Sequence, residues 1–301
     1  MAAGSPAAQR VVVRAPATIA NLGPGFDCLG LAIAWHNEIR VERDPSGDLT
    51  VTVAGQGADQ IPRDAMNLAV RAMTKIVGEP RGLRVHLTNA IPFGRGFGSS
   101  AAAIVGGLVA ARAFVPDAAA WDEEMLVDVA AGMEGHADNV APCVHGGAVV
   151  AAGRAIKPLG VPAGLGVIVC VAPSSLPTEA ARKLLPATVL HGDAAANAAR
   201  AALLAASLAT GDPARLLDAT HDVLHQPARF ELMPDSGRFV ATLRKEGIAA
   251  FLAGAGPSVA ALAGSPELAA ATETARRLAP EGWEVRDAAI DPAGATVVES
   301  A

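Results

Sequence analysis

Short runs in which apolar and polar residues alternate, or in which apolar residues follow one another, predict the strands of this chain. The segment Ala17–Gly30 is expected to be a loop, because it contains the turn formers Gly23, Pro24 and Gly25. We expect Leu49–Val53 to pair as a hairpin with the strand before it. The predicted strands are Val11–Arg14, Leu31–Glu42, Leu49–Val53, Leu83–Leu87, Ala148–Ala152, Gly166–Val171, Trp283–Asp287 and Thr296–Val298.

Apolar residues at helical spacing predict helices between these strands. The mixed order lacks a regular alternation of strand and helix, so an α+β fold is expected instead of a doubly wound sheet. Gly and Pro are frequent at 153–165, and we predict two domains, at 1–155 and 156–301. The predicted helices are Asn67–Val77, an Ala-rich run after Ser100, Trp121–Met133, Thr178–Leu185, Ala194–Thr210 and Arg215–Leu224.

The stretch Ile91–Phe114 combines a Gly-rich loop with the start of an apolar helix. Its glycines are spaced GxGxG, so it is neither a Walker A loop nor a dinucleotide-binding fingerprint. Glycine lets the backbone approach a ligand closely, and a helix that begins at Ser99 or Ser100, with either serine as N-cap, would point free N–H groups at the loop. Two readings follow: a phosphate-binding loop, or a tight turn before a buried helix.

Composition narrows the classes of protein. Half of the 301 residues are apolar (51%), and the formal charge is −6 without a run of Lys or Arg, which argues against nucleic acid as a partner. Three widely spaced cysteines fit neither a disulfide framework nor a zinc site. Residues 1–10 lack the apolar core of a signal peptide, and no apolar run is long enough to span a membrane comfortably. We therefore expect a soluble cytoplasmic protein with no membrane partner.

Two polar clusters occur in segments that we expect to be loops. Asn21 and Asp27 could contact a ligand, or could serve only the turn, since both residue types favour turns. The segment that begins at Glu134 offers a carboxylate for Mg²⁺ and side chains for substrate hydrogen bonds, or it is a solvated loop. Its polar residues are Glu134, His136, Asp138 and Asn139.

Two further clusters lie in the second half of the chain. Arg182 and Arg229, with Thr178 one helical turn before the first, could clamp a carboxylate, or could be surface residues. Gly254, Gly256 and Ser258 lie in the segment FLAGAGPSVAAL. They could approach a phosphate through the backbone, or form a tight turn between core strands. His221 and His225 have the spacing of a helical zinc pair, but Asp222 stands where the metalloprotease motif has Glu.

Together these segments resemble the GHMP small-molecule kinases, in the branch of the family that acts on L-homoserine. APATIANLGPGFDCLG is similar to the family's first motif, PFGRGFGSSA to its second and LAGAGP to its third. EGHADNVAPCVHGG and HQPAR are similar to segments typical of that branch, with Ala in place of a Tyr in HQPAR. Phe97 stands where Leu is usual in the second motif, and Pro177 where Ser is common. The resemblance extends over nearly the whole chain.

The resemblance implies a fold, a reaction and cofactors. The fold would be the two-domain α+β GHMP arrangement, with an N-terminal domain like ribosomal protein S5 and a ferredoxin-like C-terminal domain. The reaction would be ATP- and Mg²⁺-dependent phosphorylation of the side-chain hydroxyl of L-homoserine to O-phospho-L-homoserine, on the route to threonine. The family also implies a homodimer. Phosphoryl transfer has a loose transition state, so we expect direct transfer without a strong base.

The resemblance also implies roles for individual residues. Ser100 and Glu134 would hold Mg²⁺. Asp27, supported by Asn21, would bind the substrate ammonium, and Arg182 and Arg229 its carboxylate, next to Thr178. Asn139 and His136 would hold the reacting hydroxyl, and Asp138 is the alternative candidate for a base. The residues implied at the nucleotide are Asn67 at the adenine and, in the phosphate loops, Pro92, Gly94, Arg95, Gly96, Phe97, Gly98, Ser99, Ser100, Gly254 and Gly256.

Two alternatives come from the same motifs. Another GHMP kinase, such as a mevalonate-type enzyme, needs no partner for an ammonium group, so Asp27 with two arginines argues against it. A non-catalytic binding protein of the same fold could lose the metal carboxylate or the loop serines, and here Glu134, Ser99 and Ser100 are all present.

Overall fold

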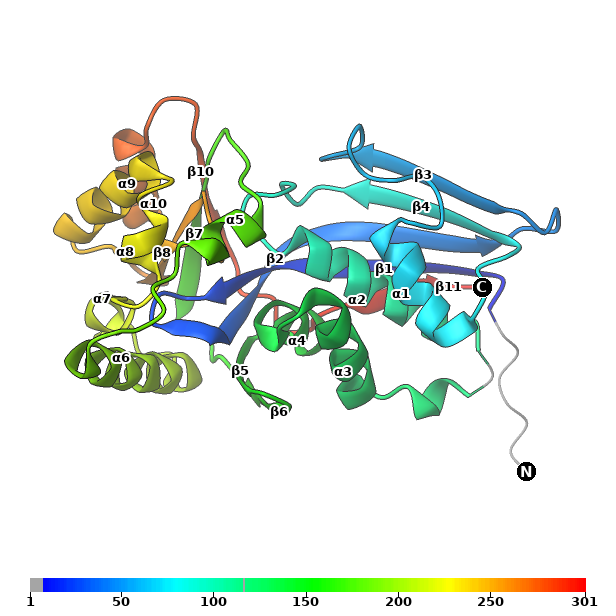
Figure 1. Ribbon diagram of the computed structural model, residues 1–301, viewed down its shortest axis with the longest axis horizontal. Coiled ribbons are helices and arrows are strands. Elements are labelled where there is room, and N and C mark those ends of the chain that lie inside the picture. The colour runs from blue at the N-terminus through cyan, green and yellow to red at the C-terminus, as the bar shows by residue number, and fades with distance from the viewer. Residues whose placement is uncertain (1–7, 116) are drawn as a thin grey trace.

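The computed structural model describes residues 8–115 and 117–301, and the N-terminal segment that bears on a signal peptide lies partly outside them. The described chain forms a seven-stranded sheet and a four-stranded sheet, joined end to end and flanked by helices (Figure 1). Among the described residues, no helix has the length and apolarity needed to cross a membrane. The mixed α+β class expected from the sequence is confirmed.

The larger sheet has the strand order β11-β1-β2-β4-β3, with β5 paired to one end of β2 and β6 to β5. In β3 and β4 the buried residues alternate with more exposed ones, as the alternating pattern predicts. The strands are β1 (Arg10–Asn21), β2 (Gly25–Arg43), β3 (Leu49–Gly55), β4 (Leu83–Asn89), β5 (Ala148–Ala152), β6 (Ala155–Leu159) and β11 (Thr296–Ser300).

The expected loop over Ala17–Gly30 is wrong. β1 continues to Asn21 and β2 begins at Gly25, so only residues 22–24 form a turn between two long antiparallel strands. The glycines and Pro24 suggested a loop, but Thr18 and its apolar neighbours are buried, and buried backbone groups need hydrogen-bond partners, which the β1–β2 pairing supplies. This hairpin reaches from the first sheet to the second and carries Asn21 and Asp27 at its tip.

The expected hairpin of β2 with β3 is also wrong. β3 pairs with β4 in parallel, in register from Leu49 opposite Leu83 to Gly55 opposite Asn89. Parallel neighbours need a crossover, and α1 (Leu68–Val77) supplies it. Alternation in the sequence identified both strands but carried no information on which neighbour each would choose.

Helices α1 to α4 gather against the larger sheet, with α2 in the middle (Figure 1). The α2 helix is apolar on all sides because it is buried on all sides. Its Gly107 lets α1 approach closely, since a Cβ there would lie 2.4 Å from the carbonyl oxygen of Ala69. The helices are α2 (Ser99–Arg112), α3 (Glu123–Glu134) and α4 (Ala137–His145), with a 3-10 turn at Ala118–Ala120.

The smaller sheet is antiparallel in the order β10-β7-β9-β8. Both of its faces are buried: Ile168 and Cys170 point to α9 and α10, and Val167 and Val169 point to the core that continues into the first sheet. The elements are β7 (Leu165–Val171), α5 (Thr178–Lys183), α6 (His191–Thr210), α7 (Leu216–Ala219), α8 (Gln226–Arg229), α9 (Pro234–Lys245), β8 (Ala249–Leu252), β9 (Val259–Gly264), α10 (Leu268–Leu278) and β10 (Glu284–Ala288).

The helices of this half were predicted only in part. The expected helix over Arg215–Leu224 is helical only in α7, because Asp222 turns the chain by accepting backbone N–H groups that follow it. The boundary between two domains at residues 155 and 156 stays a prediction. The pairing of two strands is relevant to it. β6 and β11 were both assigned to the second domain, but both belong to the first sheet.

Candidate active site

A cavity of about 480 Å³ lies where the two sheets meet. The segments that contribute to its wall are far apart in the sequence: the β1–β2 tip, the Gly-rich loop, the start of α4, α5, α8 and the turn between β8 and β9. It therefore collects almost every predicted site residue. Those in its lining are Asn21, Asp27, Pro92, Gly94, Arg95, Gly96, Phe97, Gly98, Ser99, Ser100, Glu134, His136, Asn139, Thr178, Arg182, Arg229, Gly254 and Gly256.

The Gly-rich loop before α2 has the geometry of an anion cradle. Gly94, Gly96 and Gly98 have φ of +67°, +90° and +63°, a region that favours glycine. The first helical hydrogen bond runs from the Ala102 N–H to the Gly98 carbonyl, so the N–H groups of the three preceding residues are free of it. The N-cap is Gly98 in the left-handed conformation, so the expectation of a serine N-cap is wrong, and the Ser100 hydroxyl serves another partner.

The second Gly cluster is a tight turn that packs against this loop. A Cβ on Gly96 would lie 2.1 Å from the Ala253 carbonyl oxygen, so only glycine allows the two backbones to meet. The Gly254 carbonyl accepts hydrogen bonds from Asn21 Nδ2 at 2.9 Å and from the Arg229 guanidinium at 3.1 Å. Both readings of the cluster therefore have support: it is a turn between core strands, and it lines the cavity.

Ser100 and Glu134 form a pair in this wall with the oxygen chemistry that Mg²⁺ prefers. The Ser100 hydroxyl donates to Glu134 Oε1 at 2.6 Å, and the pair lies beside the Gly-rich loop. Mg²⁺ is usually held by one or two carboxylates together with phosphate oxygens and water. A hydroxyl and a carboxylate next to a phosphate cradle fit this ion.

The segment after Glu134 is a helix, so the expectation of a loop there is wrong. Gly30 of β2 allows the start of α4 to approach, because a Cβ on it would lie 1.8 Å from the Asp138 carbonyl oxygen. Asn139 Oδ1 accepts a hydrogen bond from the Thr18 hydroxyl at 2.9 Å, which leaves its amide N–H groups for the cavity. His136 precedes the helix in an extended conformation, and its Nδ1 has no hydrogen-bond partner among the described residues, with Asp138 Oδ1 3.9 Å away.

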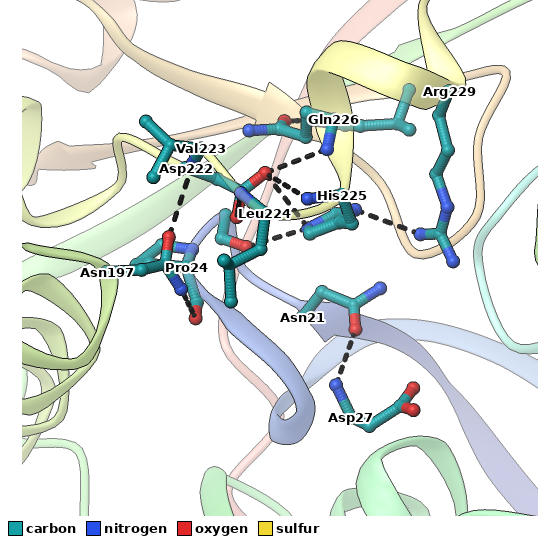
Figure 2. Close-up of polar contacts among 12 residues, drawn as sticks. Asn21, Pro24, Asp27, Asn197, Asp222, Val223, Leu224, His225, Gln226 and Arg229 are labelled. Atoms are coloured by element: carbon teal, nitrogen blue, oxygen red, sulfur yellow. Dashed lines mark hydrogen bonds and ion pairs between the residues drawn. The ribbon is translucent and has the colours of Figure 1, made fainter. Parts of the chain in front are cut away.

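Asn21 and Asp27 both have positive φ, +70° and +55°, which is uncommon for residues with a side chain. The Asp27 N–H donates to Asn21 Oδ1 at 2.9 Å, and this bond stabilises the turn (Figure 2). Strained backbone of this kind is concentrated at ligand sites. The turn chemistry expected for this pair is present, and it directs the Asp27 carboxylate into the cavity.

Asp27 and Arg182 bind each other in the lining of the cavity through two parallel hydrogen bonds, of 2.7 and 2.9 Å. The hydrogen bond to Asp27 raises the pKa of the Arg182 guanidinium. The family resemblance assigns these two groups to opposite ends of a substrate, whereas here they neutralise each other. A zwitterion could replace both partners at once, with its ammonium on Asp27 and its carboxylate on Arg182. A ligand with only one charge could not.

Arg229 is a buried cation that has no carboxylate partner in the part of the chain that the structure describes. Its side chain is 1% exposed, which excludes the surface reading for this residue. The hydrogen bonds of Nη1 go to neutral groups, His225 Nδ1 at 3.0 Å and the Gly254 carbonyl at 3.1 Å, and Nε has no partner among the described residues. Burial, together with the charge of Arg182, lowers the pKa of this guanidinium. Buried charges are usually paired, so this one fits an anionic ligand.

Asn67 is the predicted site residue that does not line the cavity. Its Oδ1 accepts a hydrogen bond from the Ala69 N–H and its Nδ2 donates to the Pro62 carbonyl, so the side chain caps α1. Its neighbour Leu68 lines the cavity. An adenine contact by Asn67 stays a prediction.

Comparison with known proteins bears directly on this cavity. A family model described as GHMP kinases N terminal domain matches residues 65–147, and a second, described as GHMP kinases C terminal, matches residues 196–285. A homoserine kinase of Streptomyces avermitilis is 44% identical over 97% of this chain and 96% of its own length. The chain belongs to the homoserine kinases of the GHMP kinase family.

Solved structures agree with this family. The crystal structure of homoserine kinase from Cytophaga hutchinsonii covers 96% of this chain and 98% of its own, with 27% identity and a TM-score of 0.86. The mevalonate kinase of L. major shares the fold at a TM-score of 0.71, with 16% identity over 96% and 99% of the two chains. The two-domain GHMP kinase fold expected from the motifs is confirmed.

Several residues that shape the site were not predicted from the sequence. Thr18 joins the start of α4 to the Gly-rich loop. Its hydroxyl donates to Asn139 Oδ1, and its N–H donates to the Phe97 carbonyl at 3.2 Å. Phe26 lies under both arginines, with the Arg182 and Arg229 guanidinium carbons 5.4 and 5.3 Å from its ring centre. No motif signals either role, because both depend on which strands meet in space.

Asp138 is the buried acid of this homoserine kinase site. It is 2% exposed and lines the cavity, and its Oδ1 has no hydrogen-bond partner among the described residues but lies 3.9 Å from His136 Nδ1. Burial, and next the negative charge of Asp27, raise the pKa of this carboxyl to about 7. It therefore carries a proton for part of the time at neutral pH, unlike an exposed carboxyl.

Asp138→Asn is expected to remove a pH dependence of stability. A carboxyl whose pKa is raised on folding stabilises the native state while it is protonated, and this stability is lost as pH rises from about 4 to about 7. The melting temperature of the parent should fall between about pH 5 and about pH 8 by more than that of the variant. Turnover of the variant within about tenfold of the parent would fit transfer without a base, and a larger loss would identify Asp138 as that base.

Proposed function

We propose that this protein transfers the γ-phosphate of ATP to the side-chain hydroxyl of L-homoserine, giving O-phospho-L-homoserine and ADP. The observation that carries the proposal is the charge arrangement of the cavity. One wall has an acid, Asp27, next to two arginines, and the opposite wall has a phosphate cradle with a serine–carboxylate pair. A zwitterionic alcohol and MgATP are complementary to these two walls.

The residues of the chain supply binding and orientation. The Gly-rich loop would hold the phosphates through backbone N–H groups, and Ser100 with Glu134 would bind Mg²⁺, which neutralises phosphate charge when bound. Asp27 would take the ammonium group and Arg182 with Arg229 the carboxylate. This leaves the side-chain hydroxyl facing His136 and the amide of Asn139. Thr178, exposed at the start of α5, would lie at the cavity mouth.

In the transfer, the hydroxyl oxygen forms a bond to the γ-phosphorus while the bond from that phosphorus to the ADP oxygen breaks. Asn139 donates hydrogen bonds and cannot accept the proton as a base. We propose that the proton passes to a phosphate oxygen, because a loose transition state places little demand on a base. Positioning and neutralisation of charge then provide most of the rate enhancement.

A substrate panel tests this proposal. The panel contains L-homoserine, the amino alcohol without its carboxylate, the hydroxy acid without its amino group, and mevalonate, with ADP release as the readout. L-homoserine should be used far better than either analogue with a single charge, since only it replaces both members of the Asp27–Arg182 pair. Preference for mevalonate would favour the alternative kinase, and no ADP with any alcohol would favour a binding protein.

Arg229→Lys is expected to weaken homoserine binding although the charge is kept. Lysine lacks the planar fork that can hold a carboxylate while it also donates to His225 and Gly254. The loss should be about 1–3 kcal/mol, which is roughly ten- to a hundredfold in KM for homoserine, with little change in KM for ATP. Arg238→Lys on the exposed face of α9 is the control. Equal preference for homoserine over the amino alcohol in parent and variant would contradict the assignment.

Two expectations from the sequence and the family resemblance belong to this proposal as well. We propose a cytoplasmic enzyme, as its composition and its small polar substrates suggest. We also propose a homodimer, which light scattering of the purified protein would test.

A further inference from the structure

Beneath the substrate end of the cavity, a buried polar cluster joins the β1–β2 tip to α8 (Figure 2). Its centre is His225, which is 0% exposed. His225 Nε2 lies 2.8 Å from the Gly23 carbonyl oxygen, and Nδ1 lies 3.0 Å from Arg229 Nη1. The imidazole thus joins the β1–β2 tip to Arg229, and it does not itself line the cavity.

The two contacts leave one protonation state for the ring. A guanidinium only donates, so Nδ1 must accept with a lone pair, and a carbonyl only accepts, so Nε2 must carry the hydrogen. An imidazolium would point an N–H at the guanidinium. Burial lowers the pKa of His225 to about 4, and the nearby positive charge of Arg229 acts in the same direction. The negative charge of Asp222 raises this pKa, but burial outweighs it. The ring is therefore neutral over the working pH range of most enzymes.

The backbone around His225 is held by Asp222. Its carboxylate accepts hydrogen bonds from the N–H groups of Leu224, His225 and Gln226 at 3.1, 3.1 and 2.8 Å. Asn197 supports the same tip from α6, since its Nδ2 donates to the Pro24 carbonyl at 2.7 Å. The imidazole also stacks on Phe26, with ring centres 5.1 Å apart. These contacts fix the ring in place and in orientation.

The hydrogen bonds of Arg229 show how the His225 ring orients its guanidinium. Nη1 has two hydrogens, and they go to His225 Nδ1 and the Gly254 carbonyl. Among the described residues, Nε has no hydrogen-bond partner. His225 therefore fixes the rotation of the guanidinium about its stem, and with it the direction of the remaining donors. The same ring holds Gly23, two residues from Asn21, so both ends of the substrate site share one support.

We propose that His225 is a positioning residue for recognition of the substrate carboxylate, acting as the neutral Nε2–H tautomer that orients Arg229. This inference rests on the proposed function, because it takes the Arg229 guanidinium to be the carboxylate site. It assigns a role to His225, the first residue of the HQPAR segment, and His225 is not among the site residues predicted from the sequence.

Two substitutions separate the halves of the imidazole. In His225→Asn the side-chain amide can occupy the place of Nδ1 and accept from Arg229, but it cannot reach Gly23. In His225→Gln the amide can reach the place of Nε2 and donate to Gly23, but the acceptor for Arg229 is lost. His221→Gln, at an exposed position four residues before, is the matched control. Steady-state KM values are suitable because they do not depend on the fraction of protein that folds.

We expect His225→Gln to raise KM for homoserine by roughly tenfold, the effect of one charged hydrogen bond lost, with KM for ATP unchanged. His225→Asn should recover most of the affinity, and His221→Gln should match the parent. The reverse order, with Asn impaired and Gln near the parent, would overturn the proposal and leave His225 a role only in the turn. Equal impairment of both variants, with KM for ATP raised too, would also overturn it.

The proposed function is tested separately in the same experiment. If the parent makes no phosphohomoserine, that function fails whatever the variants do. If the parent makes it, only the pattern among variants is in question. Nitrogen NMR of the histidine rings in the parent gives a measurement without substrate. It should show one buried ring with hydrogen on Nε2 alone at neutral pH, and hydrogen on Nδ1 would contradict the tautomer.

Discussion

Glu134→Gln is expected to reduce turnover by at least about 100-fold, because stabilisation of phosphoryl charge by a metal ion contributes several kcal/mol to catalysis. The amide keeps the size of the side chain and can still accept the hydrogen bond from Ser100, so the α3–α2 contact should persist. What it loses is the negative oxygen that a hard cation needs. Glu134 is not among the residues that we assign to homoserine, so homoserine binding should change little.

The measurement is turnover as a function of Mg²⁺ concentration, with homoserine binding followed by calorimetry. Glu124→Gln in the exposed first turn of the same helix is the matched control and should behave as the parent. Near-normal turnover of Glu134→Gln at limiting Mg²⁺ would exclude Glu134 as a metal ligand. An equal loss of homoserine affinity would indicate that the whole site is disturbed.

Gly98→Val is expected to lower ATP affinity by about 10- to 100-fold, from backbone strain of about 1–3 kcal/mol at the phosphate loop. The φ of Gly98 is +63°, and a Cβ there would lie 2.0 Å from the Thr18 hydroxyl oxygen. Either the loop or Thr18 must move, and the Thr18 hydroxyl donates the hydrogen bond that orients Asn139 through its Oδ1. The variant therefore disturbs the cradle and the amide that faces the reacting hydroxyl.

Titration calorimetry with MgATP on folded protein measures this effect, and Gly98→Ala is the milder variant if valine prevents folding. Gly153→Val is the matched control, because Gly153 has φ of +61° with no atom within 4 Å of its Cβ position, in a turn far from the cavity. It should lower the melting temperature and leave ATP affinity unchanged. Unchanged affinity in Gly98→Val would mean that the loop is only a turn.

The sequence predicted the parts of this site that depend on local chemistry. The GxGxG spacing predicted a loop whose backbone can approach a ligand, and Gly94 and Gly96 have positive φ there. The family resemblance predicted that residues of distant segments share one site. The sequence did not predict how the parts contact one another. Arg182 and Asp27 are 155 residues apart, and their mutual ion pair exists only because the β1–β2 tip reaches the second sheet.

The fold was harder to predict where tertiary contacts override local signals. α4 begins with polar residues and contains Pro142, so its sequence favours a loop, yet the close approach allowed by Gly30 stabilises it as a helix. β11 pairs with the first strand from the far end of the chain, and no pattern in the sequence specifies that partner. His225 illustrates the same limit. Its spacing to His221 is that of a helical zinc pair, a reading that Asp222 argued against, and the sequence did not indicate that Arg229, four positions later, is its partner.

One measurement tests the central claim most directly. Purified protein is incubated with ATP, Mg²⁺ and L-homoserine, and ADP and O-phospho-L-homoserine are quantified together by phosphorus NMR and mass spectrometry. We expect equal amounts of the two products, and neither in the absence of homoserine. ADP formed at the same rate without homoserine, or homoserine recovered without phosphate, would contradict the assignment of this cavity.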